Sequence, residues 1–154
     1  MKSGIRVEPA QKSDIPALIE LLALLFSIER DFCPDPEKQR RGLECLLEKP
    51  EDGVIFVARD REGDGGAIGM VSAQLVISTA SGTPSAWIED VVLRPEYRKM
   101  GIGRQLLNAA IAWAGQKGAR RLQLLADADN TPALAFYERL DWQPTRLFAW
   151  RIFV

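Results

Sequence analysis

The sequence contains no histidine among its 154 residues. This absence excludes Ser-His-Asp and Cys-His catalysis, histidine-ligated zinc and histidine pH switches. A general base must therefore be a carboxylate, a tyrosine, a lysine or a water molecule held by one of these groups. Cysteine is also scarce, because the two present, Cys33 and Cys45, match neither a CxxC redox pair nor a four-cysteine metal site. We expect both thiols to be reduced and mostly structural, and the sequence leaves the individual roles of Cys33 and Cys45 open. We expect no bound metal ion.

A surplus of positive charge and a long apolar run are lacking as well. Lys and Arg number 20 against 21 Asp and Glu, which gives a net charge of −1. Non-specific nucleic-acid binding needs a basic surplus, so we expect no nucleic-acid partner. The longest apolar stretch, Ile15 to Phe26, contains Glu20 and is too short to cross a bilayer. No apolar signal core is recognisable, so the sequence predicts a cytoplasmic protein without a membrane partner.

The sequence does contain an ordinary globular composition, with 47% hydrophobic and 27% charged residues, which predicts one domain over residues 1–154. Alternating or continuous apolar runs predict strands, and apolar residues three and four apart predict helices. The expected strands are 5–8, 54–58, 67–78, 87–93, 121–125 and 146–153, and the expected helices are 15–26, 37–48, 101–117 and 131–140, with turns at 60–66 and 80–85. We therefore expect an α+β fold with a mixed, mostly antiparallel sheet of about six strands and about four helices.

The segment from Arg98 to Arg104 joins a predicted strand to a predicted helix and contains Gly101 and Gly103. Glycines let the backbone turn tightly and leave no Cβ in the way of a ligand. The first amides of the helix lack internal acceptors and lie at the positive end of its dipole, where a phosphate or pyrophosphate can bind. A pair of glycines is common, however, and the dinucleotide fingerprint lacks its third small residue. On its own, the segment fits a simple strand–helix turn equally well.

The same segment resembles the [Q/R]-x-x-G-x-[G/A] motif of the GCN5-related N-acetyltransferases, the GNAT family, over residues 98–103. A second block, residues 130–140, resembles the family's N-x-x-A-x-x-F-Y-E-x-L-G-F segment, with Asp141 and Trp142 in place of Gly-Phe. The two blocks cover the C-terminal half, and the N-terminal half matches only in the order of its elements. The resemblance implies a GNAT-like fold, acetyl-CoA as cosubstrate, and direct acetyl transfer to a primary amine of a small molecule.

Three questions stay open at this point. The acceptor amine is undetermined, because acetylation of a protein N-terminus or a lysine fits the same motifs. A non-catalytic module that only binds acyl-CoA fits them too. Homodimers are frequent in the family, and the predicted last strand, with Trp150 and Phe153, offers an edge for pairing between subunits.

The resemblance also implies residue roles. The backbone from Arg98 to Arg104 would hold the CoA pyrophosphate, and the preceding strand end would lie beside the pantetheine arm, where one amide polarises the acetyl carbonyl. Asn130 has two interpretations, an N-cap of the helix that begins at Thr131 and a polar contact to CoA. The implied acetyl-CoA residues are Val91, Val92, Leu93, Arg98, Lys99, Met100, Gly101, Ile102, Gly103, Arg104 and Asn130.

Two side chains are candidates for catalysis. Tyr137, in the second block, resembles the family's general acid, which protonates the departing thiolate of CoA; by itself it fits a half-buried aromatic beside Phe136 better. Glu89 lies at a strand position where small-amine acetyltransferases carry an acid that binds or deprotonates the acceptor, although an ordinary strand-end acid is the alternative. Alternation places Glu89 on the face of Val91 and Leu93, and Asp90 on the opposite face unless a bulge intervenes.

Overall fold

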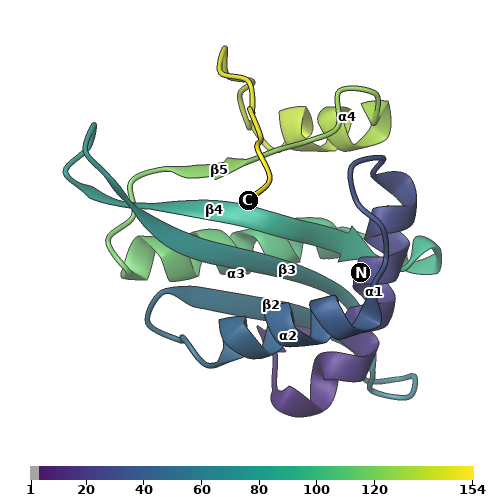
Figure 1. Ribbon diagram of the computed structural model, residues 1–154. Coiled ribbons are helices and arrows are strands. Elements are labelled where there is room, and N and C mark those ends of the chain that lie inside the picture. Colours follow the sequence, from purple (N-terminus) through teal and green to yellow (C-terminus); the bar gives the residue numbers. More distant parts are fainter. Residues whose placement is uncertain (1–3) are drawn as a thin grey trace. The chain divides into compact units, whose positions relative to one another are not determined.

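The computed structural model describes residues 4–154 and contains a mixed sheet with helices on both faces (Figure 1). The strands lie in the order β1-β2-β3-β4-β5, which confirms the α+β fold. The chain divides into two compact units, one ending at Gln123 and one covering Leu124–Val154, so the single-domain assignment stays a prediction. The elements are β1 (Ile5–Pro9), α1 (Ile15–Ile28), α2 (Pro36–Leu47), β2 (Gly53–Asp60), β3 (Ala67–Ser78), β4 (Thr83–Leu93), α3 (Ile102–Gln116), β5 (Leu122–Leu124) and α4 (Thr131–Arg139), with 3-10 turns at Lys12–Asp14 and Pro95–Tyr97.

The sheet is antiparallel from β1 to β4, and β4 is followed by a crossover through α3. β1 pairs with β2, β2 with β3 and β3 with β4 in antiparallel ladders. Next to β4, the Arg120 amide donates to the Pro84 carbonyl, and the Ala86 amide donates to the Arg121 carbonyl. Residue numbers rise together along both segments in these two bonds, which is the arrangement of a parallel pair. The expected parallel strand–helix–strand portion is therefore present.

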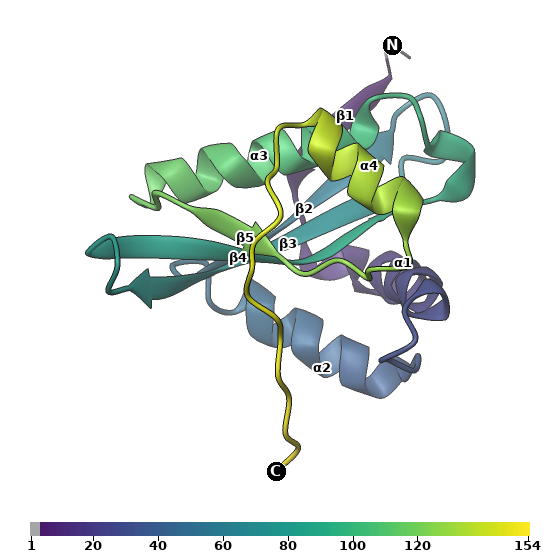
Figure 2. The same cartoon turned by 90° about the horizontal axis from the view of Figure 1, so that it is seen from above.

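The core of the first unit lies on both faces of this sheet. Helices α1 and α2 cover one face and α3 covers the other (Figure 2). The apolar stripe of α1 buries Leu18, Leu21 and Leu22 against Leu43 of α2 and Met70 of β3. On the opposite face, the buried side chains of α3 are Ile102, Leu106, Leu107, Ala110 and Ala114. None of the helices within residues 4–154 is long and apolar enough to span a bilayer.

Two expectations about strands were wrong. Residues 146–153 form no strand, so the sheet has five strands rather than about six, and side chains such as Trp150 and Phe153 are exposed. A β-forming sequence becomes a strand only where a neighbouring edge offers its backbone groups, and strand propensity alone cannot report that edge. The turn expected at 80–85 is also shorter, because Gly82, at φ +67, closes it and β4 begins at Thr83.

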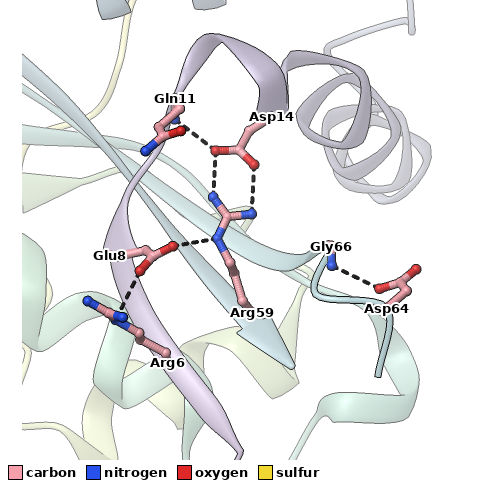
Figure 3. Close-up of polar contacts among 7 residues, drawn as sticks. All are labelled: Arg6, Glu8, Gln11, Asp14, Arg59, Asp64 and Gly66. Atoms are coloured by element: carbon pink, nitrogen blue, oxygen red, sulfur yellow. Dashed lines mark hydrogen bonds and ion pairs between the residues drawn. The ribbon is translucent and has the colours of Figure 1, made fainter. Parts of the chain in front are cut away.

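An arginine joins β1, the first 3-10 turn and β2 (Figure 3). Both terminal nitrogens of Arg59 donate to the Asp14 carboxylate at 2.7 Å, and its Nε donates to Glu8 at 2.6 Å. The Gln11 amide donates to the same Asp14 carboxylate at 2.8 Å. Burial acts to raise the pKa of Asp14, but the bonds from Arg59 and Gln11 outweigh it and hold that pKa below its usual value. Asp14 occupies the N-cap position of α1, but its carboxylate binds Arg59 instead of capping the helix.

We expect Arg59→Met to lower the free energy of unfolding at pH 7 by about 2–3 kcal/mol, because it leaves the Asp14 carboxylate buried without its cation. Urea unfolding would measure the loss. A carboxyl group with a lowered pKa stabilises the fold above its ordinary pKa, so the difference from wild type should shrink as the pH falls below about 4. Arg6→Met is the matched control, because Arg6 is exposed and its ion pair, at 2.9 Å, is with the partly exposed Glu8. An equal loss in both variants would contradict the assignment.

Candidate functional site

The turn before α3 leaves the first amides of that helix open to a ligand. Gly101 is the N-cap of α3 at φ +77, and Lys99 also has a positive φ, +61. The amides of Ile102, Gly103 and Arg104 follow it and have no acceptors within the helix. A Cβ built at Gly101 would meet no atom within 4 Å, so only its φ, and not protein crowding, demands glycine here. The open space and the positive end of the helix dipole suit an anionic group.

Contacts with the sheet hold this turn in place. The Tyr97 hydroxyl donates to the Asp60 carboxylate at the end of β2, at 3.0 Å, and this bond raises the pKa of Tyr97. The Arg94 amide donates to the carbonyl of Ile68 in β3, at 2.9 Å. The side chains of the three cationic residues of the turn, Arg98, Lys99 and Arg104, are exposed. One short segment therefore combines free amides and positive charge, as a pyrophosphate site requires.

Strand β4 contains a bulge directly before this turn. The ladder between β3 and β4 pairs Val71 with Val91 but Ala73 with Ile88, so Glu89 and Asp90 both lie opposite Ser72. The Ser72 hydroxyl donates to the Asp90 carboxylate at 2.7 Å and accepts a bond from the Asp90 amide at 3.2 Å. Ser72 is fully buried. A buried side chain thus fixes the position of the bulge.

The bulge corrects the expected face of Glu89. One extra residue reverses the alternation of side chains along β4. Glu89 lies on the face of Trp87 and does not share the face of Val91 and Leu93. Leu93 points toward α3, since a Cβ at Gly69 would lie within 2.6 Å of Leu93 Cδ1 and 3.3 Å of Leu106 Cδ1. Asp90, expected on the opposite face unless a bulge intervened, lies on the same side of the sheet as Glu89.

Two hollows open on this side of the sheet. A cavity of about 430 Å³ lies between α1, α2 and the sheet, and Asp90 and Gln74 line it. A second hollow of about 360 Å³ is lined by Gln74, Val76, Trp87 and Glu89, so Gln74 borders both. Burial and then the nearby Asp90 charge raise the pKa of Glu89, and burial raises that of Asp90 against the opposing Ser72 bond. Asp90 was not recognisable as a site residue from the sequence, because no pattern distinguished it from its acidic neighbour.

The side chains of the other residues predicted to bind acetyl-CoA at this strand end are mostly packed against the protein. Val92 is buried in the core against Met70 of β3. Val91 and Leu93 are half-buried on the face covered by α3. Met100 is exposed in the turn. A ligand lying along this strand end could contact its backbone groups and the accessible parts of Val91 and Leu93.

The second unit contains Asn130 and Tyr137. The Asn130 side chain accepts a bond from the Ala133 amide at 3.3 Å, which confirms its interpretation as the N-cap of α4. The half-buried ring of Tyr137 lies 5.3 Å from that of Phe136 and 6.0 Å from that of Trp142. Asp141 adopts φ +64, so it takes the left-handed position that favours glycine and that aspartate also tolerates. The approach of Tyr137 to Glu89 or to the turn before α3 stays a prediction.

Comparisons with known proteins give a consistent result. The sequence model described as "Acetyltransferase (GNAT) family" matches residues 15–142. An uncharacterized N-acetyltransferase of Methanocaldococcus jannaschii is 30% identical over 82% of this chain and 56% of its own length. A mycothiol acetyltransferase of Corynebacterium aurimucosum is 36% identical over 69% of this chain and 35% of its own length. The chain therefore spans about half of the first relative and about a third of the second.

A solved structure has the same fold at low sequence identity. AAC(6')-Iy, in complex with the bisubstrate analogue CoA-S-monomethyl-acetylneamine, superposes with a TM-score of 0.80 at 21% identity. The alignment covers 99% of this chain and 100% of that one. The family match covers most of the sequence and includes both blocks that carried the resemblance. The chain therefore belongs to the acetyltransferase (GNAT) family.

Proposed function

We propose that this chain transfers the acetyl group of acetyl-CoA directly to the primary amine of a small molecule. The observation that carries the proposal is the turn before α3, where the N-cap glycine, the free first amides and three exposed cations adjoin a strand bulge bearing two carboxylates. Membership of the acetyltransferase family supports acetyl-CoA as the cosubstrate. The complex of AAC(6')-Iy with a CoA-based bisubstrate analogue adds support at the level of the fold.

The residues of the turn suit the anionic part of acetyl-CoA. The amides of Ile102, Gly103 and Arg104 would donate to the pyrophosphate, and the open space at Gly101 would admit it. Arg98 and Lys99 would contribute positive charge at the rim. The backbone from Val91 to Leu93 would lie beside the pantetheine arm, and one amide there would donate to the acetyl oxygen as negative charge develops on it.

The chemistry needs three proton transfers and no covalent bond to the protein. The acceptor amine reacts only as the free base, so a carboxylate close to it must take its proton, directly or through water. Glu89 is the candidate, since its raised pKa brings it closer to that of the group it must deprotonate. The amine nitrogen then bonds to the acetyl carbon as the C–S bond breaks. Tyr137 would donate its phenolic proton to the departing thiolate, and the proton that the new amide nitrogen must lose would return to the tyrosinate directly or through water.

We expect Tyr137→Phe to lower kcat by roughly 100-fold, since general acids contribute about 10²–10⁴ to rate, and to leave the Kd of acetyl-CoA unchanged. Thiol release from acetyl-CoA would measure turnover, and calorimetry would measure binding. Tyr97→Phe is the matched control, because Tyr97 is the one other tyrosine of the sequence and bonds to Asp60. That change should weaken acetyl-CoA binding without the loss in kcat. Unchanged turnover in Tyr137→Phe would remove the general acid from the proposal.

We expect Gly101→Glu to weaken acetyl-CoA binding roughly 100-fold or more, because a carboxylate would occupy the space assigned to the pyrophosphate. Gly118→Glu provides the control at the other end of α3. Gly118 has φ +86 and equally open surroundings, so both changes add the same left-handed strain of about 1–2 kcal/mol. A calorimetric titration with acetyl-CoA should separate them, with binding kept in Gly118→Glu. Equal affinity in the two variants would show that the turn is only structural.

A further inference from the structure

We propose that the cavity between α1, α2 and the β4 bulge receives the acceptor, that Asp90 binds the acceptor's ammonium group there, and that the acceptor is a small amphipathic molecule with one positive charge. The inference rests on the proposed acetyl transfer and names the substrate class of that site. It is carried by the partners of Asp90, by the charges around the cavity and by its apolar walls. Each of these is a property of the first compact unit alone.

Asp90 is a carboxylate that lacks a cation. Its Oδ2 accepts the Ser72 bond, and no Lys or Arg of residues 4–154 forms an ion pair with it. No buried side-chain oxygen of the described chain is without a hydrogen-bond partner, so the remaining oxygen, Oδ1, keeps access to solvent, and Asp90 lines the cavity. Removing a carboxylate from water without a compensating charge is costly. An ammonium group in the cavity would supply the missing charge.

The charges that line the cavity balance, which limits the acceptor to one ammonium group. Its lining contains two cationic residues, Lys38 and Lys49, and two acidic residues, Asp52 and Asp90. A molecule with several ammonium groups, such as a polyamine or an aminoglycoside, would bring its further charges near the two lysines. A molecule with one ammonium group avoids this repulsion and still neutralises Asp90.

The remaining walls favour an apolar body of limited size. Leu22 and Phe26 of α1 face Leu43 and Leu46 of α2 across the cavity. Its volume of about 430 Å³ lies in the lower part of the range of small-molecule sites. The combination of one carboxylate at the sheet and apolar helix walls fits an aliphatic or aromatic monoamine.

An experiment that needs no acetyl transfer follows from the two cysteines. Both are exposed, but only Cys45 lines the cavity, so Cys33 serves as an internal control. The full chain would be alkylated with N-ethylmaleimide, and labelling of each cysteine would be followed by mass spectrometry. Butylamine, 2-phenylethylamine and tryptamine would be the probes at up to 10 mM. We expect at least one of them to slow labelling of Cys45 roughly 10-fold or more and to leave Cys33 unchanged.

The matched variants are Asp90→Asn and Glu89→Gln. Protection of Cys45 should be lost in Asp90→Asn and kept in Glu89→Gln. No protection by any of the three amines, or protection that survives in Asp90→Asn, would overturn the inference. Stronger protection by spermidine or kanamycin would overturn the single-charge class, and protection by trialanine alone would assign the cavity to a peptide N-terminus instead. These outcomes do not depend on turnover, so they remain distinct from a failure of the proposed acetyl transfer.

Turnover provides the second test. Loss of a charged hydrogen bond should raise the KM of the amine roughly 10- to 100-fold in Asp90→Asn, with the Kd of acetyl-CoA unchanged. Glu89→Gln should instead lower kcat. A decrease in kcat at unchanged amine KM in Asp90→Asn would contradict its role in binding the acceptor.

The thermal midpoint separates a binding role from a structural one. Because the pKa of Asp90 is raised in the folded protein, its ionisation lowers the free energy of unfolding as the pH rises toward and through that pKa. Asparagine does not titrate, so the variant does not have this loss. Asp90→Asn should therefore be more stable than wild type at pH 7, and the difference should vanish below about pH 4. The other titratable groups around Asp90 are Glu89 of the same strand, Lys38 and Cys45 of α2, and Lys49 and Asp52 of the following turn. A variant less stable than wild type at pH 7 would show that Asp90 serves the fold and overturn the inference.

Discussion

The extra residue of β4 opposite Ser72 is the constraint on which the candidate site depends. Without it, Glu89 and Asp90 would point to opposite faces of the sheet, and one of them would enter the core under α3. With it, both carboxylates lie on the side covered by α1 and α2, where the hollows open. The buried Ser72 hydroxyl bonds to both the side chain and the amide of Asp90, so the local irregularity is held by a specific contact.

The same bulge changes which side chains of β4 face the hollows and which face the core. Trp87, before the bulge, and Glu89, within it, line the second hollow. After the bulge, Val92 returns to the core, and Leu93 leads into the turn that begins α3. A strand that bends and changes its facing residues next to a helix N-terminus can serve an amine on one side and an anionic cosubstrate at its end. Bulges beside active sites commonly re-aim side chains in this way.

The sequence predicted the general architecture well, because most elements have clear apolar periodicity. The helices at α1 and α3 and the strand at β3 have the expected residues, and the glycine turn lies where the motif placed it. Asn130 caps α4, as one of its two interpretations predicted from its place before Thr131. These features are local, so the residues that form them are adjacent in the sequence.

The errors concern features that depend on distant partners. Alternation could not reveal the bulge, since it is defined by the register against Ser72, and two adjacent acids look alike in either register. Asp14 has a side chain suited to a helix cap, but Arg59, forty-five positions away, determines what its carboxylate binds. Residues 146–153 have strand-like composition, and no pattern in them reports whether a neighbouring strand edge is available.

The bond between Tyr97 and Asp60 has a consequence for affinity. Ordering a flexible loop around a ligand costs about 1–2 kcal/mol of backbone entropy for each residue fixed. Here the Tyr97 hydroxyl ties the start of the turn to the end of β2, and the Arg94 amide ties it to β3, before any ligand arrives. The entropy of fixing this turn is therefore spent during folding, and a ligand that binds its amides keeps more of its interaction energy as affinity.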